Sequence, residues 1–312
     1  MKKVIILISI VNFTYGQINR PVCGTPPSSQ QEINQISSSV EQWLGTRDND
    51  RNEMKMIFVA WHIVHASNGQ GNYGDEVAYD AVAWLNETFA PHNVVFEVDT
   101  ITRTENDEWF SDWYDDVYQG SQALSIDAFH NMNVYTADLY AAGVAGFAFF
   151  ANSFPAGDYR FSVNVDYRDL AYGNDVLTHE VGHHLNLRHT FSGSCGVDGD
   201  GISDTPRHLD SELWTCSDNL DSCPNDDGND PVHNYMTYTN SSCQYEFTLG
   251  QEDNVHYAIE TYHYGYLENN FGAPNLYVDA LSFEEDTDED GILNPGEQMK
   301  LYVDIGNSYD FD

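Results

Sequence analysis

Basic residues are scarce in this chain. Lys and Arg number 12 against 50 Asp and Glu, which gives a formal net charge of −38 over 312 residues. A surface this acidic repels phosphate backbones and anionic lipids, so we expect neither nucleic acid nor a membrane as a partner. The charge fits a saline habitat, bound cations or basic substrates.

The chain also lacks a long apolar run beyond its first residues. Residues 1–16 join two lysines to the apolar stretch VIILISIV. That stretch, of about eight residues, is too short to span a bilayer and is typical of a signal peptide. The sequence therefore predicts a secreted, extracellular protein.

Cysteine is sparse as well, with five residues in all. Four of them (Cys195, Cys216, Cys223 and Cys243) lie in one segment, and Cys23 stands alone. In an oxidising compartment the even group indicates disulfides, although four cysteines allow three pairings. A second zinc site on these cysteines is the less favoured alternative after export.

The remaining sequence predicts an α+β domain between two smaller segments. Residues 17–53 are polar and broken by Pro, Gly and Ser, so we expect a leader, or propeptide, without a core of its own. The main domain is expected over 54–272, where strands with few interleaved helices precede a loop-rich half. Expected strands are 55–66, 93–103, 132–139, 143–151 and 161–167; expected helices are 33–44, 77–89, 175–187 and 248–263, with irregular structure over 192–243.

Residues 273–312 alternate like the start of a small β module around an acidic loop. The loop follows the spacing D-x-D-x-D-G-x5-E of an EF-hand calcium site. The alternative is an acidic, solvated turn. The predicted calcium ligands are Asp286, Asp288, Asp290, Ile292 through its carbonyl, Asn294 and Glu297.

The stretch HEVGHHLNLRH, residues 179–189, carries four of the 12 histidines. Residues four apart lie on one face of a helix, so His179 and His183 present their rings side by side. Glu180 can then reach a metal-bound water without binding the metal. This is the H-E-x-x-H arrangement of zinc hydrolases, with the carboxylate as general base.

His189 completes the expected zinc site. It lies six residues beyond His183, so the helix must stop and the chain must turn before this ring can join the other two. Asn186 stands where a left-handed residue is needed. Three imidazoles leave a fourth position open, as in catalytic zinc sites. The alternative is a helix with ordinary core histidines, which is how we interpret His184.

These motifs resemble those of the metzincin metalloproteases, specifically the pappalysin type. The shared stretches are LTHEVGHHLNLRHTF, GDGISDTP, DSCP, DPVHNYMTY and FTLGQ, in this order over residues 55–265. The resemblance implies a two-subdomain catalytic domain. A twisted mixed sheet with helices would lie above the cleft, and an irregular, disulfide-bonded lower subdomain with a methionine turn would lie below it.

The resemblance also implies several roles. Met236 would form the hydrophobic floor under the zinc, and Tyr238 would stabilise the tetrahedral intermediate. The strand at Gly146, Phe147 and Ala148 would pair with an extended substrate by β-augmentation, its alternative role being simple core. The implied disulfides are Cys195–Cys223 and Cys216–Cys243.

Two positions depart from the pappalysin pattern. Asn186 stands where the family usually has Gly, which Asn can replace at some cost in backbone strain. Thr237 stands where the family often has Asp after the methionine, so the local hydrogen bonding there should differ. Neither departure touches the expected zinc ligands.

A second calcium site is expected in GVDGDGISDTP. The residues that crowd there near the active helix are Asp198, Asp200, Asp204 and Thr205. The pappalysin resemblance supports calcium at this position. Which of the four residues ligate stays open.

Cys23 suggests latency. A thiolate binds zinc strongly, and a leader that delivers it to the open position silences the enzyme. The alternatives are an intermolecular disulfide or no role. Cleavage at Arg47, Arg51 or Lys55 would then release the leader.

The sequence thus predicts a secreted zinc endopeptidase, made as a zymogen, that acts on proteins and peptides. The rival hypothesis is a secreted adhesion or binding protein that retains a structural metal. An intact Glu180 argues against the rival, because a structural site has no use for a base beside an open position. A zinc hydrolase of a non-peptide bond is a more remote alternative.

Overall fold

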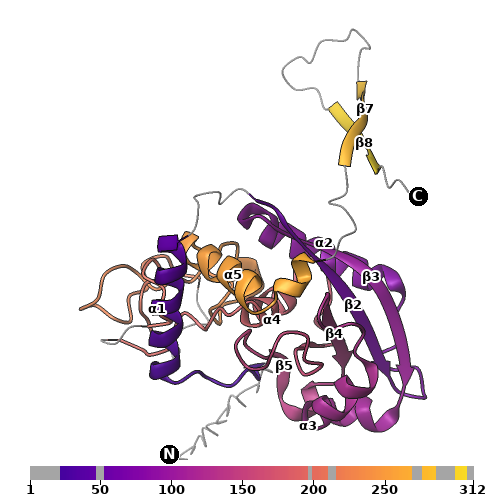
Figure 1. The fold of residues 1–312 in the computed structure, drawn as a ribbon, viewed down its shortest axis with the longest axis horizontal. Helices are drawn as coiled ribbons and strands as arrows, with labels where there is room; N and C mark the ends of the chain where they lie inside the picture. Colours follow the sequence, from indigo (N-terminus) through magenta and orange to yellow (C-terminus); the bar gives the residue numbers. More distant parts are fainter. Residues whose placement is uncertain are drawn as a thin grey trace, which may run out of the picture.

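The computed structural model describes residues 22–46, 53–195, 199–209, 216–268, 276–285 and 299–307. Figure 1 shows the arrangement of the helices and strands. They are β1 (Val22–Cys23), α1 (Gln30–Thr46), β2 (Lys55–His65), α2 (Asp75–Phe89), β3 (Val94–Glu105), α3 (Asp107–Leu124), β4 (Asn131–Ala137), β5 (Val144–Ala148), β6 (Val163–Asp166), α4 (Val176–His184), α5 (Leu249–Thr261), β7 (Leu276–Glu285) and β8 (Met299–Asn307), with short 3-10 helices at Ala90–His92, Tyr140–Ala142, Ser241–Cys243 and Tyr264–Leu267.

One mixed sheet organises the domain, in the order β1-β5-β6-β4-β2-β3. Strands β5 and β6 pair antiparallel, and the other neighbours pair parallel. This confirms the α+β class and the mixed sheet that the pappalysin resemblance implied. The five strands β2 to β6 belong to the predicted catalytic domain, and the two-residue β1 of the leader adds a sixth beside β5.

Apolar residues cover both faces of the sheet. On one face the side chains of β2, with Trp61 fully buried, pack with α2, α4 and α5. On the other face α3 packs its Trp113 against β4 and β5. Because both faces are covered, β4 and β6 are buried along their whole length rather than alternating.

Helix α3 is an element that the sequence analysis did not predict. Its N-cap is Asn106, whose side chain accepts a hydrogen bond from the Trp109 amide at 3.0 Å. Phe110, Trp113 and Val117 recur at helical spacing and are buried. Gly120 lies under the Trp113 ring, where a Cβ would come within 2.3 Å of it. Acidic residues stand between these positions in the sequence and make the apolar stripe hard to recognise there.

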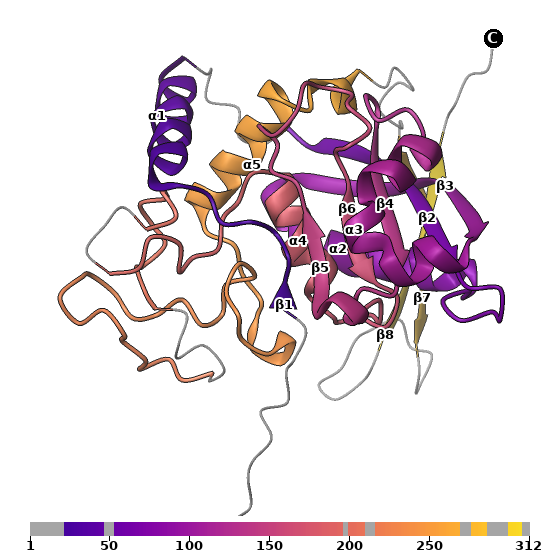
Figure 2. The ribbon, with the colours of Figure 1, turned by 90° about the horizontal axis from the view of Figure 1, so that it is seen from below.

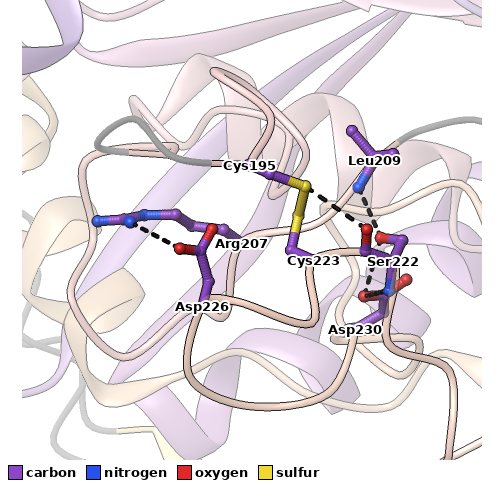
Figure 3. Close-up of a disulfide and its surroundings, with 7 residues drawn as sticks. All are labelled: Cys195, Arg207, Leu209, Ser222, Cys223, Asp226 and Asp230. Carbon is purple, nitrogen blue, oxygen red and sulfur yellow. Dashed lines mark hydrogen bonds and ion pairs between the residues drawn. A yellow bond between two sulfur atoms is a disulfide. The ribbon is translucent and has the colours of Figure 1, made fainter.

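The segment from residue 192 to 243 is irregular, as predicted. Within its described parts, the only helix is the 3-10 turn at Ser241–Cys243. Disulfides join Cys195 to Cys223 and Cys216 to Cys243, the pairing that the pappalysin resemblance implied. Figure 3 shows the first disulfide among polar contacts between loops.

In that close-up the Asp230 carboxylate accepts hydrogen bonds from the Ser222 amide at 2.9 Å and hydroxyl at 3.0 Å. The Leu209 amide donates to the Ser222 hydroxyl at 2.9 Å. Side-chain contacts of this kind satisfy backbone groups that a helix or sheet would otherwise pair. Polar bonds and disulfides therefore supplement the few side chains of this segment that join the main core, Ile202, Tyr235 and Met236.

The leader is more structured than predicted. Helix α1 spans Gln30–Thr46 instead of 33–44 and lies along α5 (Figure 2). Ile33, Ile36 and Val40 are buried, and the last two cluster with Tyr257 of α5. The leader thus lacks a core of its own but adds three apolar side chains to the interior.

Strands β7 and β8 form an antiparallel pair, in the region expected to begin a β module. The calcium loop predicted over 286–297 lies outside the described residues, as does Asp198. Those predictions therefore stay predictions. No described helix is both long and apolar enough to cross a membrane.

Candidate metal centre and catalytic cleft

The zinc motif lies on a short helix that ends in a left-handed turn. Helix α4 ends at His184, earlier than the predicted 187, and Asn186 has φ 75°. The Leu187 amide closes the turn by donating to the Gly182 carbonyl at 2.8 Å. This is the pattern of a left-handed helix C-cap, and it reverses the chain as the motif spacing requires.

The turn brings three imidazoles together. The Nε2 atoms of His179, His183 and His189 form a triangle with every side 3.1 Å. His179 Nδ1 donates to the Tyr235 carbonyl at 2.7 Å, and His183 Nδ1 donates to the Leu187 carbonyl at 2.8 Å. Since these protons lie on Nδ1, the Nε2 atoms of both rings turn bare lone pairs toward a common point.

This donor set fits zinc. A tetrahedral ion with Zn–N bonds of about 2.0–2.1 Å needs nitrogens about 3.3 Å apart, close to the triangle seen here. Burial lowers the pKa of His179 to about 4 and also holds the pKa values of His183 and His189 well below their ordinary range. The rings are therefore neutral ligands at physiological pH. Cys23 Sγ lies within 4.8 Å of the three nitrogens, so it can supply a fourth ligand.

Glu180 lies beside the triangle and is buried. Burial raises its pKa to about 8, the direction that suits a carboxylate receiving a proton near neutral pH. Strand β5 passes close to it, because a Cβ at Gly146 would come within 2.7 Å of Glu180 Cγ. The sequence analysis placed Gly146 on the substrate rim, but it did not predict that glycine makes room for the base.

Met236 lies beneath α4, where the methionine turn was expected. A Cβ at Gly182 would come within 2.4 Å of Met236 Sδ, so helix and turn touch through this glycine. The Met236 amide donates to Asn234 Oδ1 at 2.9 Å, and Asn234 in turn bonds Gln251 of α5. Thr237 Oγ1 has no hydrogen-bond partner among the described residues, in keeping with the expected change in local bonding.

Tyr238 stands at the edge of the same site. Its ring lies 5.9 Å from His179 and 4.9 Å from His189, measured between centroids. His184, in contrast, points away from the triangle and lies 2.9 Å from the Tyr266 hydroxyl. This agrees with its interpretation as a packed histidine.

The upper rim is the edge of β5 that faces away from β6, and β1 covers it in this structure. The residues of β1 pair with Val144 and Gly146, and further along Thr25 contacts Ala148. Phe147 differs from its neighbours because its carbonyl points to β6, where it accepts a hydrogen bond from Asn164 Nδ2 at 3.2 Å. Its side chain is buried against Tyr114. Of the three predicted substrate residues, only Gly146 and Ala148 offer backbone groups to the edge.

A cavity of about 150 Å³ opens next to the triangle. Asp175 contributes a buried carboxylate to its lining, with Oδ1 bonded to Trp84 Nε1 at 2.9 Å and Oδ2 without a partner among the described residues. The sequence analysis missed this cavity, because its walls come from distant segments. They are formed by Cys23, Ala145, Asp175, Val176, His179, Glu180, Thr237, Tyr238, Thr239, Ser241 and Gln244.

The second predicted calcium cluster is only partly assembled. Thr205 Oγ1 donates to Asp200 Oδ1 at 2.6 Å. Asp204 instead accepts bonds from the Thr248 hydroxyl and the Gly250 amide at the start of α5. Among the described residues, no three His, Cys, Asp or Glu side chains converge here as they do at the histidine triangle.

Comparison with known proteins decides the family. A family model described as pregnancy-associated plasma protein-A matches residues 119–260. An extracellular metalloprotease of Verticillium alfalfae is 36% identical over 219 residues, which cover 66% of this chain and 76% of that protein. An extracellular metalloprotease of Colletotrichum graminicola is 33% identical over 269 residues, covering 80% and 94%.

The chain belongs to the pappalysin family of metalloproteases. It is an extracellular zinc metalloendopeptidase. The alternative hypothesis, a non-catalytic adhesion or binding protein, is therefore rejected. Solved structures share the fold. Promirolysin of Tannerella forsythia matches with a TM-score of 0.63 at 23% identity, covering 78% of this chain and 96% of that one. Mature mirolysin in complex with a cleaved peptide matches at 0.58 and 24% identity, covering 69% and 96%.

Proposed function

We propose that this pappalysin is secreted as a latent zymogen and, once its leader is removed, hydrolyses peptide bonds with Glu180 as general base. The observation that carries the proposal is the triangle of Nε2 atoms, 3.1 Å on each side, with the buried Glu180 beside it. His179, His183 and His189 would hold the zinc. When bound, zinc polarises the scissile carbonyl and acidifies the attacking water.

The residues of the chain supply the remaining chemistry. Glu180 accepts the proton of the attacking water and passes it to the leaving amine. Tyr238, whose ring lies near those of His179 and His189, donates a hydrogen bond from its hydroxyl to the developing oxyanion. Met236, packed on Gly182, forms the hydrophobic floor beneath the metal site.

The β5 edge positions the substrate. An extended peptide would pair with the backbone of Gly146 and Ala148, the edge that the leader uses here. The cavity lined by Val176 and Tyr238 would then receive a substrate side chain next to the scissile bond.

The position of the leader in the active site accounts for the proposed latency. Cys23 Sγ lies within reach of all three imidazole nitrogens and 3.6 Å from Glu180 Oε2, so it stands where water and substrate must enter. Lys55, one of the three cleavage sites considered, is buried at the start of β2, and its amide donates to the Asn93 carbonyl at 2.8 Å. Cleavage within residues 47–52 is therefore the better-supported route to activation.

Digestion of casein tests the proposal. The processed enzyme should cleave casein, lose activity with phenanthroline and regain it when zinc is restored. Glu180→Ala should fold and keep its metal content but lose activity by about 10²–10⁴-fold, the usual contribution of a general base. Near-normal turnover by this variant would defeat the assignment of Glu180.

A further inference from the structure

The leader reaches beyond its cysteine into the catalytic cleft. After Cys23, the Gly24 amide donates to the Gly146 carbonyl of β5 at 2.7 Å. Thr25 follows and is 6% exposed. Three consecutive leader residues therefore occupy the metal centre, the substrate edge and the space between them.

The Thr25 hydroxyl contacts the groups that a substrate needs. It accepts a hydrogen bond from the Ala148 amide at 2.9 Å. Its own proton faces two acceptors, Glu180 Oε2 at 3.2 Å and the Ala148 carbonyl at 3.3 Å. One side chain thus engages both the general base and the last backbone groups of β5.

We propose that Thr25 is a second latch of the zymogen, which holds Glu180 and the β5 edge independently of the Cys23 thiol. The inference rests on the proposed latency and extends it. Removing the thiol frees the metal position, but Glu180 still faces the Thr25 hydroxyl and the edge stays covered. The unprocessed enzyme without its cysteine therefore remains largely latent.

The contacts show why the hydroxyl matters. Thr25→Val keeps the shape of the side chain but removes both the donor and the acceptor. The Ala148 amide would then be buried without a partner, and Glu180 Oε2 would keep only its 3.6 Å contact with the Cys23 thiol, which the double variant removes as well. Both losses are costly in a dry site. The equilibrium between the closed and the open leader would therefore shift toward the open state by about tenfold or more.

Activity of the intact chain tests the proposal. Cys23→Ala, Thr25→Val and the double variant are prepared with the leader attached, as verified by intact mass, and are compared with enzyme whose leader has been removed by limited proteolysis. We expect Cys23→Ala to have less than one tenth of the activity of the processed enzyme. The double variant should exceed Cys23→Ala by at least tenfold.

Thr46→Val is the matched control, because Thr46 is an exposed leader residue that bonds only within α1. Combined with Cys23→Ala it should change nothing. Full activity of Cys23→Ala alone would overturn the second latch but leave latency intact, and so would a double variant no more active than Cys23→Ala. Full activity of the unprocessed wild type would instead overturn the proposed latency itself.

A thiol assay gives a readout independent of turnover. The other four cysteines are in disulfides, so DTNB reports only on Cys23 in the unprocessed protein. Thr25→Val should speed this reaction at least fivefold, because the leader opens more often, and Thr46→Val should not. An unchanged rate in Thr25→Val would contradict the proposal.

Discussion

The two halves of the cleft are stabilised by different interactions. Above it, β2 is buried over nearly its whole length and the sheet is packed on both faces by helices. Below it, the described parts of 192–243 are held by two disulfides and by side chains that bond to backbone. A single active site drawn from both halves depends on the joint between them.

That joint combines the packing of Met236 on α4 with direct hydrogen bonds. His179 of the upper half donates to the Tyr235 carbonyl of the lower half at 2.7 Å. The Thr190 amide donates to the Met236 carbonyl at 3.2 Å. The regular half therefore presents two of the histidines, and the irregular half sets the orientation of one of their rings.

The largest expected effect comes from forcing the halves apart. Gly182→Ala places a methyl group 2.4 Å from Met236 Sδ, so the Met236 side chain, α4 or the methionine turn must move. Overpacking of this kind costs about 1–3 kcal/mol, and small displacements of catalytic groups can cost about 10²-fold in rate. Casein turnover and thermal unfolding measure both effects.

Met236→Ala supplies the control background. It removes the clash, so Gly182→Ala should cost less thermal stability in Met236→Ala than in the wild type, a comparison that cancels the cost of the lost methionine. An equal cost in both backgrounds would show that the contact between the halves is not what Gly182 protects.

Opening a disulfide should weaken the lower half alone. Cys195→Ser with Cys223→Ser removes a bridge over 28 residues, which costs roughly 3–4 kcal/mol in the chain-entropy account. Hydrogen exchange should rise in 199–209 and 216–243 while β2 and β4 stay protected. Uniform loss of protection across the sheet would mean that the halves unfold as one unit.

The upper half contains a buried histidine that makes its stability sensitive to acid. His62 is buried in β2, donates through Nε2 to Asn133 Oδ1 at 2.9 Å, and lies 2.8 Å from the Thr102 hydroxyl through Nδ1. Burial lowers the pKa of His62 to about 4, from an ordinary value of 6.5. The folded state therefore binds fewer protons than the unfolded state between these values.

The resulting stability is fully present above pH 6.5 and is lost as the pH falls toward 4, by about 3 kcal/mol for a shift of this size. His62→Gln should flatten this part of the stability curve, measured by urea unfolding at several pH values. Parallel curves for wild type and His62→Gln would show that other groups carry the acid sensitivity.

The smallest effect is expected at the turn between the halves. Asn186 has φ 75°, a region that costs a side chain with a Cβ about 1–2 kcal/mol and costs glycine little. Asn186→Gly should therefore keep or slightly raise the melting temperature, and Asn186→Ala should lower it. The reverse order would indicate that the Asn186 side chain, and not its backbone, stabilises the turn.

Motifs with short spacing were predictable from the sequence because local geometry determines them. The face shared by His179 and His183 follows from helical periodicity, and the return of His189 follows from one left-handed residue. The main strands of the sheet followed from β-branched and aromatic runs. In each case the neighbours that decide the structure lie within a few residues.

Long-range choices were not predictable. Nothing in the β6 sequence says that it inserts between β4 and β5. The apolar face of α1 finds its partner in α5, more than two hundred residues away, so the leader looked like a segment without a packing role. The position of Thr25 against Glu180 depends on the register of β1 beside β5, which no local pattern encodes.

Glu260 of α5 bonds to residues on either side of the expected cleavage segment. It accepts a hydrogen bond from Trp43 Nε1 at 3.0 Å and pairs with the buried Lys55 amine at 2.8 Å. Cutting the chain between these residues removes the tryptophan with its helix but leaves the lysine in place. On the proposed activation route, the strand that begins the catalytic domain is thus anchored before the cut is made and has no need to refold.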